Sequence, residues 1–330
     1  MKHLVLVGAC YLDTILTVPH FPPEDAKLRA TSLTVRRGGN CPNTLQVFHQ
    51  LVQSSPASTT SVTSHLISPL PSRSSPATQQ ILSSFIDSST STDQADGTSR
   101  STSTTTQRSV LDFKRCMYRE EHSSPASSYI VRSTATSSRT IINYNELEEM
   151  SLGEFVKIAE EIAEEITSSV GSEASDGDAD GCWWHFEGRI PETTLQCIRH
   201  IRRVSPRSTV SVEVEKPNRD GLSALAAEAD IVFYSRTWAE VSQVLHNPRR
   251  KHIAEDTPAQ KLVYEANQFP PRLGAGDTFI AGMLYGLICH TDDWNREAKL
   301  RFAVELATKK VQREGFAGLG LGLGLEGTGA

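Results

Sequence analysis

The sequence predicts an α/β fold: one domain with a mostly parallel sheet and helices on both of its faces. In the second half of the chain, strand-like runs alternate with helical runs at 183–186, 191–203, 209–214, 220–228 and 230–234. This alternation is typical of βαβ units, whose strands run parallel. A continuous apolar strand opens the chain at 4–7, and an apolar helical run follows a glycine-rich turn near its end.

Composition argues against several classes of partner. The 330 residues carry a formal net charge of −6, which gives no electrostatic attraction to nucleic acid or to an anionic membrane. No apolar run approaches the length that spans a bilayer, and the N-terminus is better explained as a first strand than as a signal peptide. The six cysteines are scattered, without a C-x-x-C pair. We therefore expect reduced thiols, no structural zinc and a cytoplasmic location.

The first strand leads to an acidic residue, Asp13. In open α/β sheets, ligands bind at the carboxyl edge of the strands. Asp13 is therefore a candidate ligand-binding residue, although an aspartate after a strand is also a common turn residue. By the same argument, Glu215-Lys216-Pro217 follows the predicted strand 209–214 at a position where ligand contacts belong. Residues 28–37 alternate loosely, which predicts an edge or lid strand.

The stretch Gly38-Gly39-Asn40-Cys41-Pro42-Asn43 offers a second set of candidates. Its two glycines permit a close approach to the backbone. The amides of Asn40 and Asn43 can donate and accept hydrogen bonds to sugar hydroxyls. A glycine turn with an asparagine cap explains the same residues, so both interpretations stay open on this stretch alone.

The middle of the chain changes composition. Of the 22 residues from 88 to 109, 14 are Ser or Thr. Such a segment cannot bury enough apolar surface to offset its ordering entropy, so we predict a disordered insertion there. Apolar groups at 65–67 and 80–86 are expected to be folded parts of the core. The glycine–leucine repeat of 319–330 predicts a low-complexity tail after a folded domain of residues 1–318.

Two further strand-like runs lie at 111–119 and 127–143. Together with 14–37, the stretch 111–143 is expected to form a small β-sheet lid. Residues 153–167 predict an amphipathic helix, because apolar residues recur on one face at helical spacing. These residues are Phe155, Ile158, Ile162 and Ile166.

The stretch Gly274-Ala275-Gly276-Asp277-Thr278-Phe279 carries the strongest chemical signal. It precedes a run that is apolar almost all round, which predicts a buried helix. The free amides and the dipole of its N-terminus form a seat for an anion such as phosphate. A carboxylate at Asp277 can act as general base on a hydroxyl that attacks a phosphoryl group. The simpler alternative is a glycine turn with an aspartate cap.

This string resembles the signature of the ribokinase-type (PfkB) sugar kinases, and G-G-N-x-x-N resembles their N-terminal signature. Further strings resemble the ketohexokinase (fructokinase) branch of that family: 184–189 (W-H-F-E-G-R), 210–217 (V-S-V-E-V-E-K-P) and 269–272 (F-P-P-R). The resemblance implies a ribokinase-like fold and ATP-dependent phosphorylation of a sugar, with fructose to fructose 1-phosphate favoured. It also implies ATP and Mg²⁺ as cofactors and a homodimer formed through the lid.

The resemblance assigns roles residue by residue. Asp277 matches the catalytic base, and the amides of Gly274, Ala275 and Gly276 match the anion hole. Arg139 matches an arginine that contacts ATP phosphate. The residues that match sugar ligands are Asp13, Gly39, Asn40 and Asn43.

The chain departs from the family pattern between 236 and 273. Ser235-Arg236-Thr237-Trp238 stands where the family often carries N-x-x-E for magnesium, a pattern from which the ketohexokinase branch also departs. The stretch from Arg236 to Asn267 is short, polar and helical in pattern. We therefore expect at least one core strand and part of the nucleotide site to be absent, through an incomplete gene model or a real loss. This keeps two alternatives open: a catalytically impaired sugar-binding or regulatory relative, and a kinase for another sugar or nucleoside. A dinucleotide oxidoreductase is disfavoured, because no G-x-G-x-x-G loop occurs.

Overall fold

The computed structural model describes residues 2–55, 60–86, 109–169, 182–235, 237–238, 262–265 and 274–320. Apart from Ser109, the Ser/Thr-rich insertion expected at 88–109 lies outside these ranges, and so does the tail beyond residue 320. Within them, no helix combines the length and the apolar character needed to cross a membrane.

Seven strands form the central sheet, in the order β13-β12-β11-β10-β1-β4-β6. They are β1 (Lys2–Val7), β4 (Val62–Ile67), β6 (Ser109–Asp112), β10 (Cys182–Glu187), β11 (Thr209–Val214), β12 (Ile231–Tyr234) and β13 (Leu262–Glu265). Every neighbouring pair is parallel, which confirms the predicted α/β fold. The expected strand at 209–214 has the predicted bounds.

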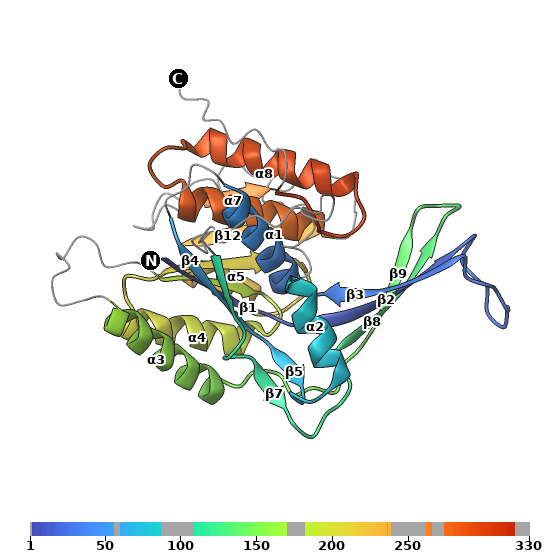
Figure 1. The fold of residues 1–330 in the computed structure, drawn as a ribbon, viewed down its shortest axis with the longest axis horizontal. Helices are drawn as coiled ribbons and strands as arrows, with labels where there is room; N and C mark the ends of the chain where they lie inside the picture. The colour runs from blue at the N-terminus through green and yellow to red at the C-terminus, as the bar shows by residue number, and fades with distance from the viewer. Residues whose placement is uncertain are drawn as a thin grey trace, which may run out of the picture.

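Helices cover both faces of this sheet (Figure 1). One layer contains α1 (Asn40–Ser54), α2 (Pro76–Ile86), α7 (Ala275–Cys289) and α8 (Arg296–Val311); the other contains α3 (Leu152–Ser169), α4 (Pro191–Val204) and α5 (Leu222–Glu228). Successive side chains of a strand point to opposite faces. Accordingly, Leu4 and Leu6 of β1 join the apolar core of the first layer, while Val5 and Val7 join that of the second.

Helix α7 is apolar on nearly all sides and almost entirely buried, as its sequence predicted. It packs against α1 and α8. The approach to α8 depends on Gly282, because a Cβ at this residue would lie 2.8 Å from the Cα of Ala303. Tight packing on both sides fixes the N-terminus of α7 relative to the sheet.

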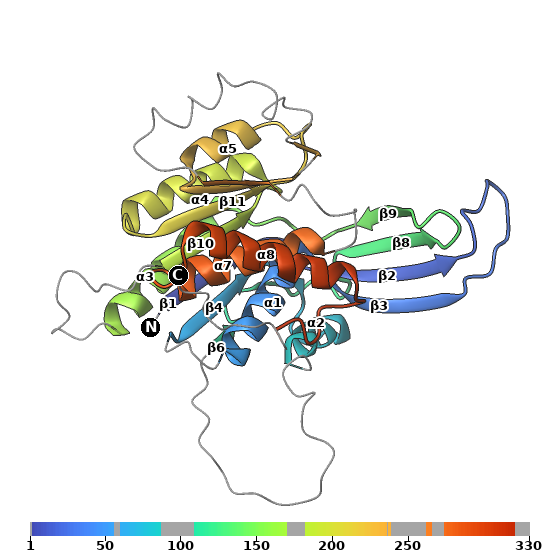
Figure 2. The same ribbon diagram turned by 90° about the horizontal axis from the view of Figure 1, so that it is seen from above.

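A separate four-stranded sheet, hereafter the projecting sheet, extends from the body of the protein (Figures 1 and 2). It has the order β3-β2-β8-β9. Its strands are β2 (Tyr11–Val18), β3 (Ser32–Gly38), β8 (Ser127–Ser133) and β9 (Arg139–Tyr144). The pairing of β2 with β8 is parallel, and the other two pairings are antiparallel.

The lid was expected to contain residues 14–37 and 111–143. The second of these ranges is wrong, because its first strands belong to other sheets. Strand β6 pairs with β4 in the central sheet, and β7 (Met117–Arg119) pairs with β5 (Pro69–Pro71) in a two-stranded sheet. The projecting sheet takes only 127–133 and 139–144 from this stretch. A short strand-like run does not indicate which sheet it joins, because the pairing partner is distant in sequence.

The stretch 236–273 contributes one described strand. Strand β13 continues the central sheet by pairing in parallel with β12. The helical pattern expected between Arg236 and Asn267 is therefore wrong at 262–265. Apart from β13 and residues 237–238, the stretch lies outside the described residues.

Candidate active site

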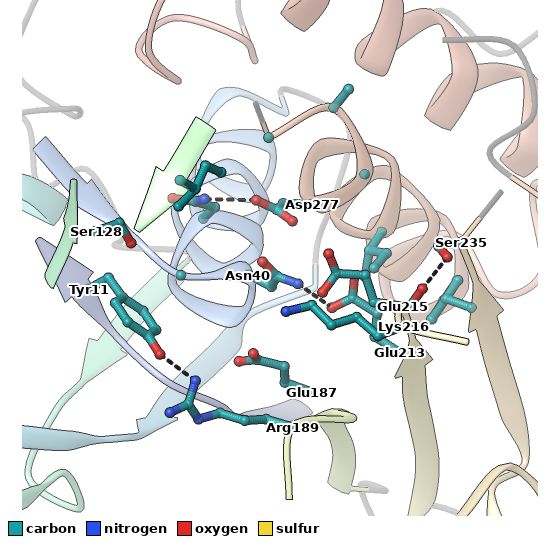
Figure 3. A pocket seen from close by; sticks show the side chains of 18 of the residues that line it. Tyr11, Asn40, Ser128, Glu187, Arg189, Glu213, Glu215, Lys216, Ser235 and Asp277 are labelled. Carbon is teal, nitrogen blue, oxygen red and sulfur yellow. Dashed lines mark hydrogen bonds between the residues drawn. The ribbon is translucent and has the colours of Figure 1, made fainter. Parts of the chain in front are cut away.

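A cavity of about 430 Å³ lies between the projecting sheet, the carboxyl ends of β10, β11 and β12, and the N-termini of α1 and α7 (Figure 3). Every residue that the sequence predicted for the site lines it: Asp13, Gly39, Asn40, Asn43, Arg139, Gly274, Ala275, Gly276 and Asp277. The fold therefore brings together residues from both ends of the chain, as an active site requires.

Asp277 lies in the first turn of α7, with 7% of its surface exposed. Asn43 Nδ2 donates a hydrogen bond of 2.7 Å to Asp277 Oδ2. Burial raises the pKa of Asp277 to about 7, and the hydrogen bond from Asn43 opposes this rise. Glu215 and Glu187 raise this pKa further, while Arg37 lowers it. The carboxylate therefore titrates near neutrality, where a general base is most effective.

The N-terminus of α7 is open to an anion. The backbone N–H and the hydroxyl of Thr278 both donate to the carbonyl oxygen of Gly274, at 3.0 and 2.7 Å, and close the first helical turn. Gly274 has a φ of 84° and offers no side chain to the helix amides. A Cβ at Gly276 would meet nothing within 4 Å. The amides of Ala275, Gly276 and Asp277 have no partner one turn earlier in the helix, as at any helix start.

The N-terminus of α1 approaches the same cavity through Gly39. This residue has a φ of 104°, and a Cβ there would lie 2.2 Å from the carbonyl oxygen of Ala9. Only glycine fits this turn without strain. The turn presents Asn40 and Asn43 to the cavity from positions three residues apart in the helix.

Asp13 lies within β2 rather than in a turn after β1. It is 7% exposed and borders the cavity from the projecting sheet. Burial raises its pKa, while a hydrogen bond with Ser128 and the charges of Arg36 and Arg37 lower it. A Cβ at Gly38 would lie 2.4 Å from both carboxylate oxygens of Asp13, so the first glycine of the motif makes room for this side chain.

Sequence reasoning did not assign roles to two glutamates of the cavity, the half-buried Glu187 and the buried Glu213. Glu187 ends β10 and accepts a hydrogen bond of 3.0 Å from the backbone N–H of Ala9. Glu213, on β11, accepts a hydrogen bond of 2.9 Å from Asn40 Nδ2. Burial raises the pKa of both glutamates. Their positions near the carboxyl ends of predicted parallel strands were the signal that could have found them.

Four cationic side chains also line the cavity: Arg139, Arg189, Lys216 and Arg219. Arg139, at the start of β9, has a pKa lowered by burial and raised by Glu215. Arg219 donates a hydrogen bond of 2.6 Å to the carbonyl oxygen of Gly188. These residues supply positive charge suited to a polyphosphate.

The described residues contain no group of three or more His, Cys, Asp or Glu side chains that could hold a metal ion. Mg²⁺ generally keeps several waters and takes one or two carboxylates together with phosphate oxygens. Glu187, Glu213 and Glu215 are the cavity carboxylates of suitable chemistry near the strand ends.

No protein-family model and no curated protein matches the sequence. Solved structures do match. Ribokinase from Giardia lamblia aligns with a TM-score of 0.65 at 13% identity, over 96% of this chain and 95% of that one. A nucleoside kinase from Methanocaldococcus jannaschii aligns with a TM-score of 0.61 at 16% identity, over 96% and 95% of the two chains.

Phosphofructokinase-2 from Escherichia coli, solved in complex with fructose-6-phosphate, aligns with a TM-score of 0.61 at 15% identity. The alignment covers 95% of this chain and 95% of that one. At these identities the likeness concerns the fold. The fold is ribokinase-like, and the neighbours named here are kinases that share it.

Proposed function

We propose that this protein is an ATP-dependent carbohydrate kinase of the ribokinase (PfkB) type, with Asp277 as general base. One observation carries the proposal: the buried Asp277 carboxylate lies at the N-terminus of α7, in the cavity that also contains every residue expected to hold sugar or phosphate. The kinases among the structural neighbours support the same class of reaction.

In the proposed complex, Asp13, Gly39, Asn40 and Asn43 hold the sugar and turn one primary hydroxyl toward Asp277. Asp277 accepts the proton of this hydroxyl. The hydroxyl oxygen attacks the γ-phosphorus of ATP in line with the leaving ADP oxygen. The amides at the start of α7 stabilise the charge that develops on the transferred phosphoryl group.

ATP enters from the side of Arg139 and Lys216, whose charges suit its phosphates. Glu187, Glu213 or Glu215 would hold Mg²⁺ or its waters, and the ion would neutralise charge on the ATP phosphates when bound. The part of the nucleotide site that belongs to 236–273 is described only at residues 237–238 and 262–265.

Fructose, phosphorylated to fructose 1-phosphate, is the substrate we favour, on the strength of the ketohexokinase-like strings at 184–189 and 210–217. The polar lining of the cavity also suits other polyols. The neighbours include a ribokinase, a nucleoside kinase and a phosphofructokinase, so a panel of ketoses, aldoses and nucleosides is the appropriate assay.

A second candidate is a sugar-binding relative that does not turn over. It is favoured by the shortened stretch 236–273. Calorimetry separates the two candidates. An ATP-dependent kinase binds ATP with Mg²⁺ at millimolar nucleotide or below, whereas sugar binding without ATP binding would favour the second candidate.

We also propose a homodimer formed through the projecting sheet. Thr14 pairs with both Val35 and Tyr129, and Tyr129 pairs with Ile142. Paired residues share a face, and cavity residues such as Asp13 lie in the next row, on the opposite face. The face turned away from the cavity exposes apolar side chains that a second copy would cover: Leu33 (63%), Val35 (43%), Tyr129 (48%), Ile142 (60%) and Tyr144 (50%).

The decisive assay measures ADP release over the substrate panel for wild type beside Asp277→Asn. The proposal expects ADP release by the wild type with at least one sugar and a strong loss in the variant. Equal rates for both proteins on every substrate would remove Asp277 from the mechanism.

A further inference from the structure

Arg37 is a buried guanidinium directly behind the active-site cavity. It is the second-to-last residue of β3, and 5% of its surface is exposed. It is not among the residues that line the cavity. Burial lowers its pKa to about 10. Holding a cation in such a place is costly unless its donors are satisfied.

The donors of Arg37 point to three neutral acceptors on two helices. Nη1 donates to Asn43 Oδ1 at 3.1 Å, Nε donates to Ser84 Oγ at 3.1 Å, and Nη2 donates to Gln46 Oε1. The guanidinium also lies over the ring of Phe85, 4.2 Å from its centroid. The side chain is therefore fixed by α1 on one side and α2 on the other.

This contact determines which end of the Asn43 amide faces the reaction centre. A guanidinium only donates, so the end of the amide beside Arg37 must be the oxygen. The NH₂ end then faces Asp277, where Nδ2 donates to Oδ2 at 2.7 Å. If the amide were flipped, its oxygen would face Asp277. An oxygen only accepts hydrogen bonds, so this arrangement would favour the protonated form of Asp277, which can donate one.

We propose that Arg37 is a positioning residue: by holding the Asn43 amide oxygen, it keeps the amide NH₂ on Asp277 and favours the ionised carboxylate. The inference rests on the proposed role of Asp277 as general base. Hydrogen bonds to the charged form of an acid stabilise that form. The hydrogen bonds from Arg37 to Asn43 and from Asn43 to Asp277 therefore increase the fraction of Asp277 that is ionised at neutral pH.

Other charged or titratable groups also act on Asp277 or respond to it. They are Glu187 of β10, Glu213 of β11, Glu215 after β11, Arg36 beside Arg37 on β3, and Cys41 of α1. The glutamates favour protonation of Asp277 and the arginines oppose it. Loss of Arg37 therefore removes both a positioned hydrogen bond and a positive charge, and the test must separate the two.

The experiment titrates Asp277 by carboxyl ¹³C NMR in the full-length protein, with its signal assigned by its loss in Asp277→Asn. In Arg37→Met we expect the pKa of Asp277 to rise by about one unit. The ionised fraction at pH 7 would then fall about fivefold, and kcat/KM with it. Arg202→Met is the control, because Arg202 is a partly buried arginine away from the cavity that donates to the backbone carbonyls of Ser208 and Glu228 and pairs with Asp230.

A double-mutant cycle with Asn43→Ala separates positioning from charge. If Arg37 acts through the amide, most of the pKa rise caused by Arg37→Met disappears in the Asn43→Ala background. An equal rise in both backgrounds would mean that Arg37 acts through its charge alone. An unchanged pKa of Asp277 in a folded Arg37→Met protein would mean that Arg37 has no effect on it. Either result would overturn the proposal. If Arg37→Met fails to fold, Arg37→Lys takes its place in both backgrounds. The titration needs no turnover, so a protein without kinase activity would refute the proposed function and leave this test intact.

Discussion

Asn43 and Asp277 are 234 positions apart in the sequence, yet their side chains are joined by a hydrogen bond of 2.7 Å. The contact connects the N-termini of α1 and α7, which are the two helices that approach the cavity from the same layer. Thr44 strengthens the junction by donating to the carbonyl oxygen of Asp277 at 3.2 Å. The two signature stretches of the sequence thus form one structural unit.

Replacement of the proposed base should separate turnover from binding. Asp277→Asn keeps the size of the side chain and an acceptor for Asn43, but it cannot accept the proton. We expect kcat to fall by about 10²–10⁴-fold while the dissociation constant of the sugar changes little. Steady-state kinetics and calorimetry on the same preparations measure both quantities. A variant that retains full kcat would contradict the role of Asp277.

The same substitution should affect stability in a pH-dependent way. Asp277 has an ordinary pKa of 3.8 when unfolded, and burial raises it to about 7 in the folded protein. As pH rises from about 4 to 7, the unfolded state loses its proton first, so the folded state becomes relatively less stable. Asn carries no such penalty. We expect Asp277→Asn to melt at a higher temperature than wild type at pH 8, with the difference disappearing near pH 4.

The pH dependence of kcat/KM should report the charges around Asp277. We expect an acidic limb near pH 7, because the ionised carboxylate is the active form. Glu215 raises the pKa of Asp277, so Glu215→Gln should move this limb to lower pH, by less than about one unit because Glu215 is exposed. Glu305→Gln, an exposed glutamate of α8, serves as the control and should leave the limb in place. A shift to higher pH in Glu215→Gln would refute this electrostatic account.

The two glycines at the start of α7 should respond differently to alanine. A Cβ at Gly274 would lie 2.3 Å from the ring of Phe316, at a φ of 84°, so Gly274→Ala should destabilise the fold by about 1–3 kcal/mol. A Cβ at Gly276 enters open space. Gly276→Ala should keep or raise the melting temperature but weaken ATP binding, because the methyl group occupies the anion seat. Unchanged ATP affinity in Gly276→Ala would argue against that seat.

The proposed dimer can be tested through one exposed side chain of the projecting sheet. Ile142 is 60% exposed on β9, so a charge there costs the monomer little but would be buried in the interface. We expect Ile142→Asp to be monomeric and wild type dimeric by light scattering at micromolar concentration. Leu300→Asp, at an exposed apolar position of α8, should remain dimeric. A monomeric wild type would contradict the proposal.

The sequence by itself determined the elements whose patterns are local. The strand at 209–214 and the buried helix after Gly274 follow from apolar runs and glycine turns that need no distant partner. The glycine pair at 38–39 also signals a turn locally, but the clash that excludes a side chain at Gly39 is with the distant Ala9. Local patterns predicted the fold class and the candidates Asp13, Asn40, Asn43 and Asp277, whereas Arg139 came only from the resemblance to a family; all five line one cavity.

Only the tertiary structure decided which distant groups meet. Strand pairing assigned β6 to the central sheet instead of the lid, and parallel registration brought Glu187 and Glu213 to the cavity. The contact of Arg37 with Asn43, and of Asn43 with Asp277, depends on how β3, α1 and α7 pack. The spacing of apolar residues in the sequence indicates which face of a helix or strand is buried. Which element packs against that face depends on segments that are far apart in the chain.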